Sequence, residues 1–247
     1  MLRLTDLLKE GVYDPGILKC IFMAGGPGSG KSKVTDEIFG FGNGLARVNA
    51  AGLKIVNSDT AFEAQLKKSG IDGKELARIE KEEPELWKKI TEDPKGEREL
   101  AKITTKKIKS FYEAGRLGMI IDGTGDDVEK IQRQKREAES LGYDTFMVFV
   151  NTSLEVAKYR NSMRQSRRLP DDLLIDSWKE CQNNLGKFQT IFSSANFRIV
   201  DNTKDGNNVS SSCRKHVDMF VNSGIRNPIG KKWVTTQLML RNANIIK

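Results

Sequence analysis

Short apolar segments recur along the chain, and turn-forming or polar residues bound each of them. Longer stretches in which apolar residues recur at helical spacing separate these segments. The expected strands cover residues 17–24, 53–56, 119–121, 145–150 and 197–200, and the expected helices cover 31–39, 59–68, 74–90, 97–114, 126–141, 154–163 and 171–192. Strands that alternate with helices predict an α/β fold with a doubly wound parallel five-stranded sheet. Ligands of such folds lie at the carboxyl ends of the strands.

The two ends of the chain depart from this alternation. Residues 1–16 begin with leucines interrupted by charged residues, which predicts a short amphipathic helix that docks on the core. After residue 202 one further helix is expected over 211–224, followed by a basic segment. We therefore expect one domain over residues 1–202 and a helical, basic C-terminal extension over 203–247.

A glycine-rich loop follows the first expected strand. Residues 25–32, GGPGSGKS, match the pattern G-x-x-x-x-G-K-[ST] at every fixed position, with a strand before and a helix after. Glycines permit the tight path that points several backbone N–H groups inward, and the helix N-terminus adds its positive end. The lysine of such a loop reaches the β- and γ-phosphates, and the serine hydroxyl can ligate Mg²⁺. The residues expected to bind ATP and Mg²⁺ are Gly25, Gly26, Gly28, Ser29, Gly30, Lys31, Ser32 and Lys33.

The phosphate loop alone does not distinguish a kinase from a GTPase or a motor ATPase. The guanine-specifying pattern N-K-x-D is missing, since DNTKD at 201–205 resembles it only superficially. None of the expected strands ends in the paired acids that hydrolytic motors usually carry. A transferase is therefore favoured.

Asp59 stands where the second expected strand meets its helix. A carboxylate there can cap the helix by accepting backbone N–H bonds. It can also face the terminal phosphate from across the sheet and accept the proton of an attacking hydroxyl. The position beside a phosphate loop favours the second role, and Asp59 is also, with Ser32, an expected ligand of Mg²⁺.

Two stretches resemble a known kinase family. IVNSDTAFEAQ at 55–65, and the segment at 119–152 that begins MIIDGTG, are similar to the zeta-toxin kinases and, more distantly, to the 5′-hydroxyl polynucleotide kinase domain. The resemblance spans residues 17–200 and implies a P-loop kinase fold. It implies that Asp59 is the catalytic base and that Asp122 and Thr124 touch the acceptor. Asp122 stands where those toxins more often have glutamate, and the shorter acid puts the identity of the acceptor in question.

Four arginines lie within nine residues after the fourth strand: Arg160, Arg164, Arg167 and Arg168. Residues 160–172 are expected to form a lid between two helices. Arginines clamp the charge of a transferring phosphoryl group with bidentate donors. The resemblance implies that one arginine acts from the helix before the lid, which Arg160 or Arg164 matches, and one from the lid itself, which Arg167 matches; Arg168 is expected to bind substrate. The alternative is a solvated basic helix end that pairs with acids at 171–172. The resemblance implies that the loop after the fifth strand, with Asn202, lies against the adenine ring; a plain strand-to-helix turn explains the segment equally well.

The charge distribution bears on the acceptor. The net charge is +8, and residues 1–150 are balanced, so the entire excess lies in residues 151–247. This favours a polyanionic ligand such as a nucleotide or nucleic acid, with a solvated basic surface as the alternative. Trp233 among Lys231, Lys232 and Arg241 favours nucleic acid slightly.

The expected function is ATP-dependent transfer of a phosphoryl group to a hydroxyl, with Asp59 as general base. The acceptor would be nucleic acid, as a 5′-end or a hydroxymethylated base in DNA. The alternatives are a nucleotide-sugar kinase like the zeta toxins and a nucleotide-dependent regulatory ATPase, and an antitoxin-like protein partner is left open.

Other classes of site are not expected. The three cysteines share no close spacing and His216 is the single histidine, which indicates no structural metal and no Ser-His-Asp chemistry. Free thiols and the absence of a long apolar run indicate a cytoplasmic protein without a membrane partner.

Overall fold

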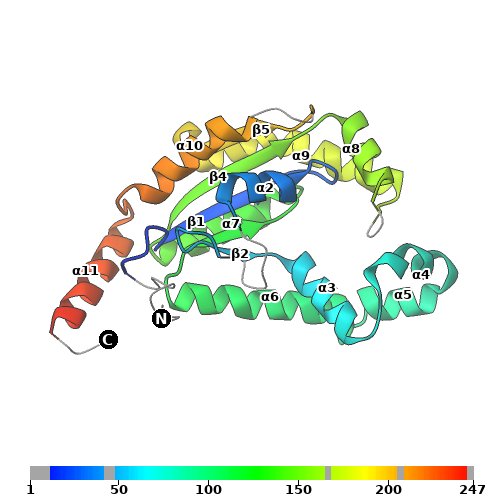
Figure 1. Cartoon of the computed structure of the whole chain (residues 1–247), viewed down its shortest axis with the longest axis horizontal. Coiled ribbons are helices and arrows are strands. Elements are labelled where there is room, and N and C mark those ends of the chain that lie inside the picture. The colour runs from blue at the N-terminus through cyan, green and yellow to red at the C-terminus, as the bar shows by residue number, and fades with distance from the viewer. Residues whose placement is uncertain (1–11, 42–47, 165–167, 205–208, 244–247) are drawn as a thin grey trace, which may run out of the picture.

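The computed structural model describes residues 12–41, 48–164, 168–204 and 209–243 of the chain (Figure 1). Its centre is a sheet of five strands in the order β2-β3-β1-β4-β5, in which every neighbouring pair is parallel. The strands are β1 Lys19–Ala24, β2 Lys54–Val56, β3 Met119–Asp122, β4 Asp144–Asn151 and β5 Phe197–Asp201. The sheet confirms the expected α/β fold, and each strand overlaps its expected segment.

Helices cover both faces of the sheet. The α-helices are α2 Lys31–Phe39, α3 Ser58–Lys68, α4 Leu76–Glu82, α5 Pro84–Thr91, α6 Glu97–Ala114, α7 Val128–Ser140, α8 Leu154–Ser162, α9 Asp171–Phe192, α10 Val209–Asn222 and α11 Pro228–Asn242. Ile21 and Met23 of β1 belong to a core cluster with residues of α2 and α10, whereas Cys20 and Phe22 belong to one with residues of α7 and α9. Alternate strand residues therefore serve opposite faces, as the pleat of a strand requires.

The helix expected over residues 74–90 is not continuous. Residues 73–75 form a 3₁₀ turn, α4 ends at Glu82, and α5 begins at Pro84. Proline lacks an N–H and clashes with the preceding turn, so it can start a helix but not continue one. The break folds α4 and α5 back, and α3 to α6 share a small apolar cluster of their own. We call residues 58–114 the helical cap; in Figure 1 it lies beside the sheet, below α8.

The C-terminal region contains two helices, and the first belongs to the core. Cys213, Val217 and Phe220 of α10 are buried in the cluster that also holds α2. Helix α10 therefore packs in the same core cluster as the sheet. Helix α11 forms where only a basic segment was expected, with Pro228 in its first turn and Asn227 as its N-cap. The helix expected at the N-terminus falls on residues 1–11, outside the described part of the chain.

A buried ion pair ties the start of the sheet to the connection between α10 and α11. Lys19 Nζ lies 3.0 Å from Asp144 Oδ2, and the two side chains are 1% and 6% exposed. Asp144 also accepts backbone N–H bonds from Arg226 and Asn227, both at 2.9 Å. Burial lowers the pKa of the Lys19 ammonium, against the raising effect of the Asp144 carboxylate. The carboxylate therefore links β1, β4 and the C-terminal segment.

Replacing Asp144 with alanine is expected to lower the free energy of unfolding by about 3–5 kcal/mol, because it leaves a buried ammonium and two backbone donors without their acceptor. Urea unfolding followed by circular dichroism measures the change. Asp218→Ala is the matched control, because Asp218 lies on the exposed side of α10, 3.9 Å from Arg214, and should change stability little. Equal effects of the two substitutions would contradict a structural role for the buried pair.

The described helices include none that is both long enough and apolar enough to cross a membrane. All three cysteines lie within the described residues, where each is buried and carries a free thiol.

Candidate active site

The phosphate loop connects β1 to α2 at the carboxyl end of the sheet. Gly28 and Gly30 have positive φ angles of 76° and 77°, a conformation that only glycine adopts without strain. Gly30 is the N-cap residue of α2, and no side chain caps the helix. The first N–H groups of α2 are therefore available for an anion. The path of the loop and the uncapped start of α2, with Lys31 as the first residue of the helix, therefore fit a phosphate group.

The loop is packed closely from behind at Gly28 and Gly30, so these two glycines have no room for a side chain. A Cβ on Gly28 would lie 2.4 Å from the carbonyl oxygen of Ala157, and one on Gly30 would lie 2.3 Å from Asn202 Nδ2. Asn202 donates from the same nitrogen to the carbonyl oxygen of Ser29 at 2.8 Å. The structure thus shows the Asn202 side chain bracing the phosphate loop.

Gly30→Ala is expected to raise the dissociation constant for ATP about tenfold, since a strain of about 1–2 kcal/mol would be relieved by moving the loop. Isothermal titration with a non-hydrolysable ATP analogue measures the change. Gly40→Ala is the control, because Gly40 has a similar φ of 63° but nothing lies within 4 Å of its added Cβ. Weakened binding in both variants would assign the effect to helix α2 as a whole rather than to the loop.

A chain of polar contacts connects the loop to the start of α3. Lys31 Nζ lies 2.8 Å from Asp122 Oδ1, at the end of β3. The other oxygen of Asp122 accepts a hydrogen bond from Asn57 Nδ2 at 2.5 Å, and Asn57 Oδ1 accepts the backbone N–H of Asp59 at 2.6 Å. The order of the strands brings these side chains together: β3, which ends at Asp122, lies between β1 and β2, which precede Lys31 and Asn57.

Asn57, and not Asp59, is the N-cap of α3. The N-cap position considered for Asp59 is therefore held by Asn57. Asp59 Oδ1 lies 3.2 Å from Arg98 NH1, in the first turn of α6. The side chain is half exposed and lines the same cleft as Lys31. The sequence analysis missed both Asn57 and Arg98; only Asn57 could have been found, as a capping residue type directly after a strand.

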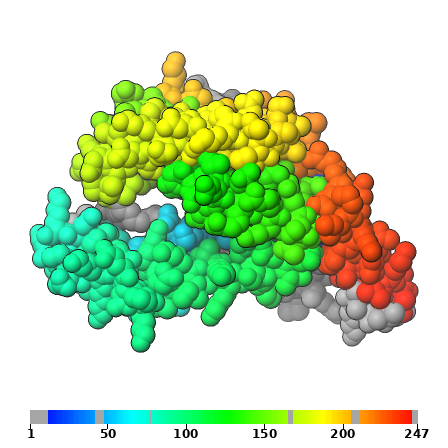
Figure 2. All heavy atoms as spheres, turned by 180° about the vertical axis from the view of Figure 1, so that it is seen from behind, coloured from blue at the N-terminus to red at the C-terminus, as the bar shows by residue number. Residues whose placement is uncertain are grey.

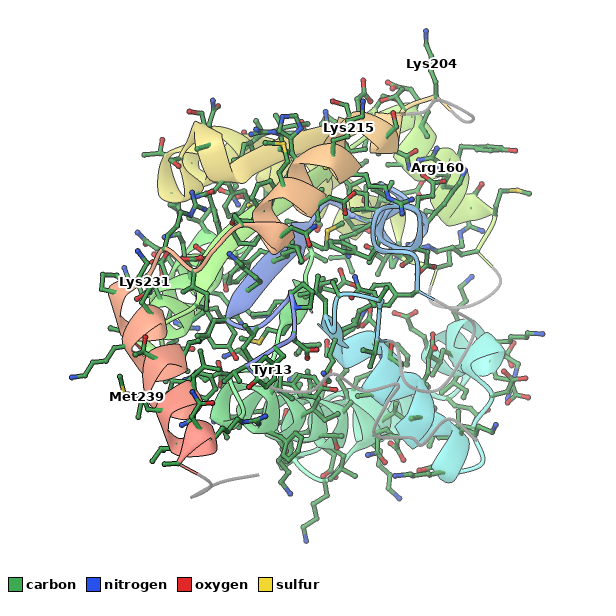
Figure 3. All side chains as sticks on the ribbon, turned by 60° about the vertical axis from the view of Figure 1, so that its left-hand side comes forward. Tyr13, Arg160, Lys204, Lys215, Lys231 and Met239 are labelled. Carbon is green, nitrogen blue, oxygen red and sulfur yellow. The ribbon has the colours of Figure 1, made fainter. Side chains whose placement is uncertain are left out.

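The arginines of the lid differ in their surroundings. Arg160 NH1 donates to the carbonyl oxygen of Ser29 at 3.4 Å, so this side chain reaches the phosphate loop (Figure 3). Arg164 and Arg168 line the cleft. Arg167 lies outside the described residues.

Asn161 connects the end of α8 to the segment that precedes α9. This fully buried residue donates from Nδ2 to the carbonyl oxygen of Leu169 at 2.8 Å and accepts the N–H of Leu169 at 3.1 Å. The two bonds hold the end of α8 against the segment before α9. Sequence reasoning did not identify Asn161, because its partner is a backbone that only the fold brings close.

Thr124 and Cys181 pack behind the loop. The carbonyl oxygen of Thr124 accepts the N–H of Gly25 at 2.9 Å and the Cys181 thiol at 3.2 Å. The Thr124 hydroxyl donates to Asp126 Oδ1 at 2.5 Å. Burial raises the pKa of the Cys181 thiol to about 12, which keeps it protonated and excludes it as a nucleophile at neutral pH.

The phosphate loop, described residues at the end of α8 and the start of α9, and the helical cap line a cleft of about 940 Å³. Figure 2 shows a hollow between the cap and the helices α8 and α9. The described residues that line the cleft include the basic side chains Lys31, Lys33, Arg98, Lys102, Arg160, Arg164 and Arg168 and the acidic side chains Asp59, Glu63, Glu80 and Asp122. The surplus of positive charge favours anionic ligands. Trp87 and Thr91 of the cap line the cleft as well; sequence reasoning missed the contributions of the cap, because its folding back at Pro84 brings them there.

The basic C-terminal helix lies away from this cleft. In Figures 1 and 3, α11, which carries Lys231, and α8, which carries Arg160, are at opposite sides of the molecule. Trp233 packs against a core cluster, so it is not an exposed platform for stacking bases. The structure therefore removes the reason to connect this helix with an acceptor in the cleft.

Among the described residues, no group of three or more histidine, cysteine, aspartate or glutamate side chains could hold a metal ion. Mg²⁺ bound with nucleotide does not need one, since it uses one or two protein oxygens together with phosphate and water. Ser32 and Asp59, the expected ligands, line the cleft, as does the Asp122 carboxylate. This donor set fits Mg²⁺ that arrives with a nucleotide.

Comparisons with known proteins bear on the family and the fold of this chain. A family model described as AAA domain matches residues 20–188, more than half of the 247 residues. No protein of curated function matches the sequence significantly.

Solved structures share the fold at low sequence identity. A candidate kinase from Chloroflexus aurantiacus J-10-fl has a TM-score of 0.50 at 13% identity, covering 81% of this chain and 97% of that one. The PezAT toxin–antitoxin system of Streptococcus pneumoniae has a TM-score of 0.47 at 12% identity, with coverage of 97% and 89%. Shikimate kinase from Bacteroides thetaiotaomicron has a TM-score of 0.46 at 15% identity, with coverage of 83% and 99%. The similarity to the Chloroflexus protein concerns the fold alone, and no property of this chain is inferred from the other two.

Proposed function

Because this chain belongs to the AAA-domain family and has the five-stranded parallel sheet of the P-loop kinases, we propose that it is an ATP-dependent phosphotransferase that acts on a hydroxyl group. The observation that carries the proposal is the polar series from Lys31 through Asp122 and Asn57 to the start of α3. It sets the Asp59 carboxylate in the same cleft as the phosphate loop. A base and a phosphate cradle in one cleft suit transfer to a positioned hydroxyl.

The roles of the residues follow from their positions. The phosphate loop and Lys31 hold the β- and γ-phosphates of ATP, and Asp59 accepts the proton of the attacking hydroxyl. Arg160, Arg164 and Arg168, which line the cleft, contribute positive charge toward the moving phosphoryl group, and Arg167 keeps the catalytic role expected from the sequence. Mg²⁺, held by Ser32 together with Asp59 or Asp122, supplies further charge neutralisation when it is bound.

A nucleotide arriving in the cleft competes for the contacts that Lys31 makes in the free protein. The Lys31 and Asp122 side chains are 17% and 9% exposed, so their ion pair is partly shielded from water. Phosphate oxygens offer Lys31 a second set of acceptors. Asp122 remains hydrogen-bonded through Asn57, which keeps the carboxylate in place when Lys31 turns to the phosphate.

An acceptor screen tests the proposal. The protein is mixed with ATP labelled at the γ-phosphate and with 5′-hydroxyl DNA, DNA containing hydroxymethylated bases, RNA, nucleosides and nucleotide sugars. Label in one acceptor, lost in Asp59→Asn, supports the transferase. A nucleic-acid acceptor is the sequence-based expectation and a nucleotide sugar the alternative.

A regulatory ATPase is the second candidate, favoured by the ion pair between Asp59 and Arg98, which occupies the proposed base in the free protein. Label that appears only as inorganic phosphate, at a rate that Asp59→Asn leaves unchanged, would identify this function and overturn the first.

A further inference from the structure

The contact between Asp59 and Arg98 joins the proposed base to the helical cap. Arg98 lies in the first turn of α6, and its guanidinium carbon lies 5.0 Å from the centre of the Phe62 ring of α3. The aromatic face and the Asp59 carboxylate together set the position of the guanidinium. The cap thereby presents a cation directly at the base.

A ligand can replace one partner of the ion pair between Arg98 and Asp59. The Arg98 and Asp59 side chains are 36% and 50% exposed, and one guanidinium nitrogen makes the 3.2 Å contact. Exposed pairs of this kind contribute little to stability. A guanidinium has five N–H donors, and within the described residues the Arg98 side chain makes this one hydrogen bond. Donors therefore remain for an anion that enters the cleft.

The wall of the cleft around Arg98 can hold an anionic group. Lys102 lies one turn after Arg98 on the same face of α6 and also lines the cleft. Its ammonium is paired with Glu99 at 3.0 Å in an exposed contact, which a phosphate can displace. Two cations one turn apart are matched better by the double negative charge of a phosphate monoester than by the single charge of a carboxylate.

We propose, on the basis of the proposed phosphotransferase function, that Arg98 is a specificity-determining residue that holds Asp59 in the free protein and exchanges it for a phosphate group of the acceptor. When the acceptor enters, its phosphate draws Arg98 and Lys102, and the Asp59 carboxylate exchanges the Arg98 contact for a hydrogen bond from the acceptor hydroxyl. The proton then moves from that hydroxyl to Asp59 as the oxygen bonds to the γ-phosphorus and ADP leaves. Water without a phosphate group does not release the base, so ATP hydrolysis without acceptor stays low.

The test measures ADP formation from ATP in the absence of acceptor. Arg98→Gln should raise this rate about fivefold, the factor that corresponds to an exposed ion pair of about 1 kcal/mol. Arg98→Lys, which keeps the charge but not the guanidinium geometry, should give an intermediate rate. Arg78→Gln is the matched control, because Arg78 is also paired with acids of the cap but does not line the cleft, and it should leave the rate unchanged.

Adding Asp59→Asn to Arg98→Gln should remove the increase, which distinguishes release of the base from a general loosening of the cap. An unchanged rate in Arg98→Gln, or an increase that persists in the double variant, overturns the proposal. Thermal unfolding of each variant confirms that the proteins compared are folded.

The second arm of the test identifies the chemistry of the anion. ADP formation is measured with UMP, ribose 5-phosphate, uridine and ribose, which gives two pairs that differ by one phosphate. The two phosphate-bearing compounds should accelerate the wild-type protein and not Arg98→Gln. Equal stimulation by the phosphate-free partners overturns the assignment of Arg98 to phosphate.

The two proposals fail separately. If label never reaches any acceptor but Arg98→Gln hydrolyses ATP faster through Asp59, the transferase is wrong and the role of Arg98 stands. If label reaches an acceptor and neither Arg98 variant alters hydrolysis or acceptor preference, the transferase stands and the role of Arg98 is wrong.

Discussion

Asp59→Asn is expected to lower kcat for transfer by about two to four orders of magnitude, the usual contribution of a general base. Asparagine has nearly the shape of aspartate but cannot take up the proton of the acceptor hydroxyl. The binding of ATP should change little, because the phosphate loop is untouched. Rates with labelled ATP and the acceptor found by screening give kcat, and titration with a non-hydrolysable analogue gives the affinity.

The fold of the Asp59→Asn protein should be preserved. Asn57 remains as the N-cap of α3, and the lost ion pair with Arg98 is an exposed one. Asp127→Asn is the matched control, since Asp127 caps α7 through the N–H of Lys130 at 2.8 Å, outside the cleft, and asparagine caps equally well. A kcat for Asp59→Asn within a few-fold of the control would show that Asp59 is not the base.

Lys31→Met is expected to lower kcat by about two to three orders of magnitude, comparable to the loss of one preorganised donor to a developing negative charge. Methionine keeps much of the length and apolar stem of lysine but has no cation for the β- and γ-phosphates. The affinity for ATP should fall as well, because Lys31 binds the ground state of the same phosphates. Transfer rates at saturating ATP separate the two effects.

Lys31→Met also leaves Asp122 without its partner at 2.8 Å, with the hydrogen bond from Asn57 retained. The double variant Lys31→Met, Asp122→Asn therefore tests whether the Asp122 carboxylate, left without Lys31, adds to the loss of kcat. Lys215→Met serves as the control for removing a lysine, since Lys215 is exposed on α10 (Figure 3). Transfer by Lys31→Met at a rate close to that of the control would contradict a role for the phosphate loop in this reaction.

The local sequence was sufficient for the phosphate loop and for the alternation of strands and helices. Positive φ angles at Gly28 and Gly30 and the uncapped start of α2 are consequences of residue types at fixed spacing. The five strands were recognisable for a similar reason: central parallel strands are buried on both faces and form short apolar runs. The helix over 74–90 was predicted too long, because its apolar spacing continues across Pro84, where the backbone cannot.

The contacts between distant segments could not be predicted in this way. Lys19 with Asp144, and Asn202 with the carbonyl of Ser29, join residues whose sequence neighbourhoods contain no sign of the partner. Arg98 is the clearest example, since one arginine on a charged helix resembles any other. It meets Asp59 only because α3 and α6 pack through the apolar cluster of the cap.

The sequence by itself determined that this protein has a parallel α/β sheet and a phosphate loop, because backbone conformation and burial depend on local residue type and periodicity. The tertiary structure alone decided which side chains share the cleft, since that depends on the strand order, with β3 between β1 and β2, and on the folding back of the cap. Charge along the chain located the basic excess in the C-terminal part, but only the fold showed that α11, with Lys231, lies across the molecule from Arg160 of α8.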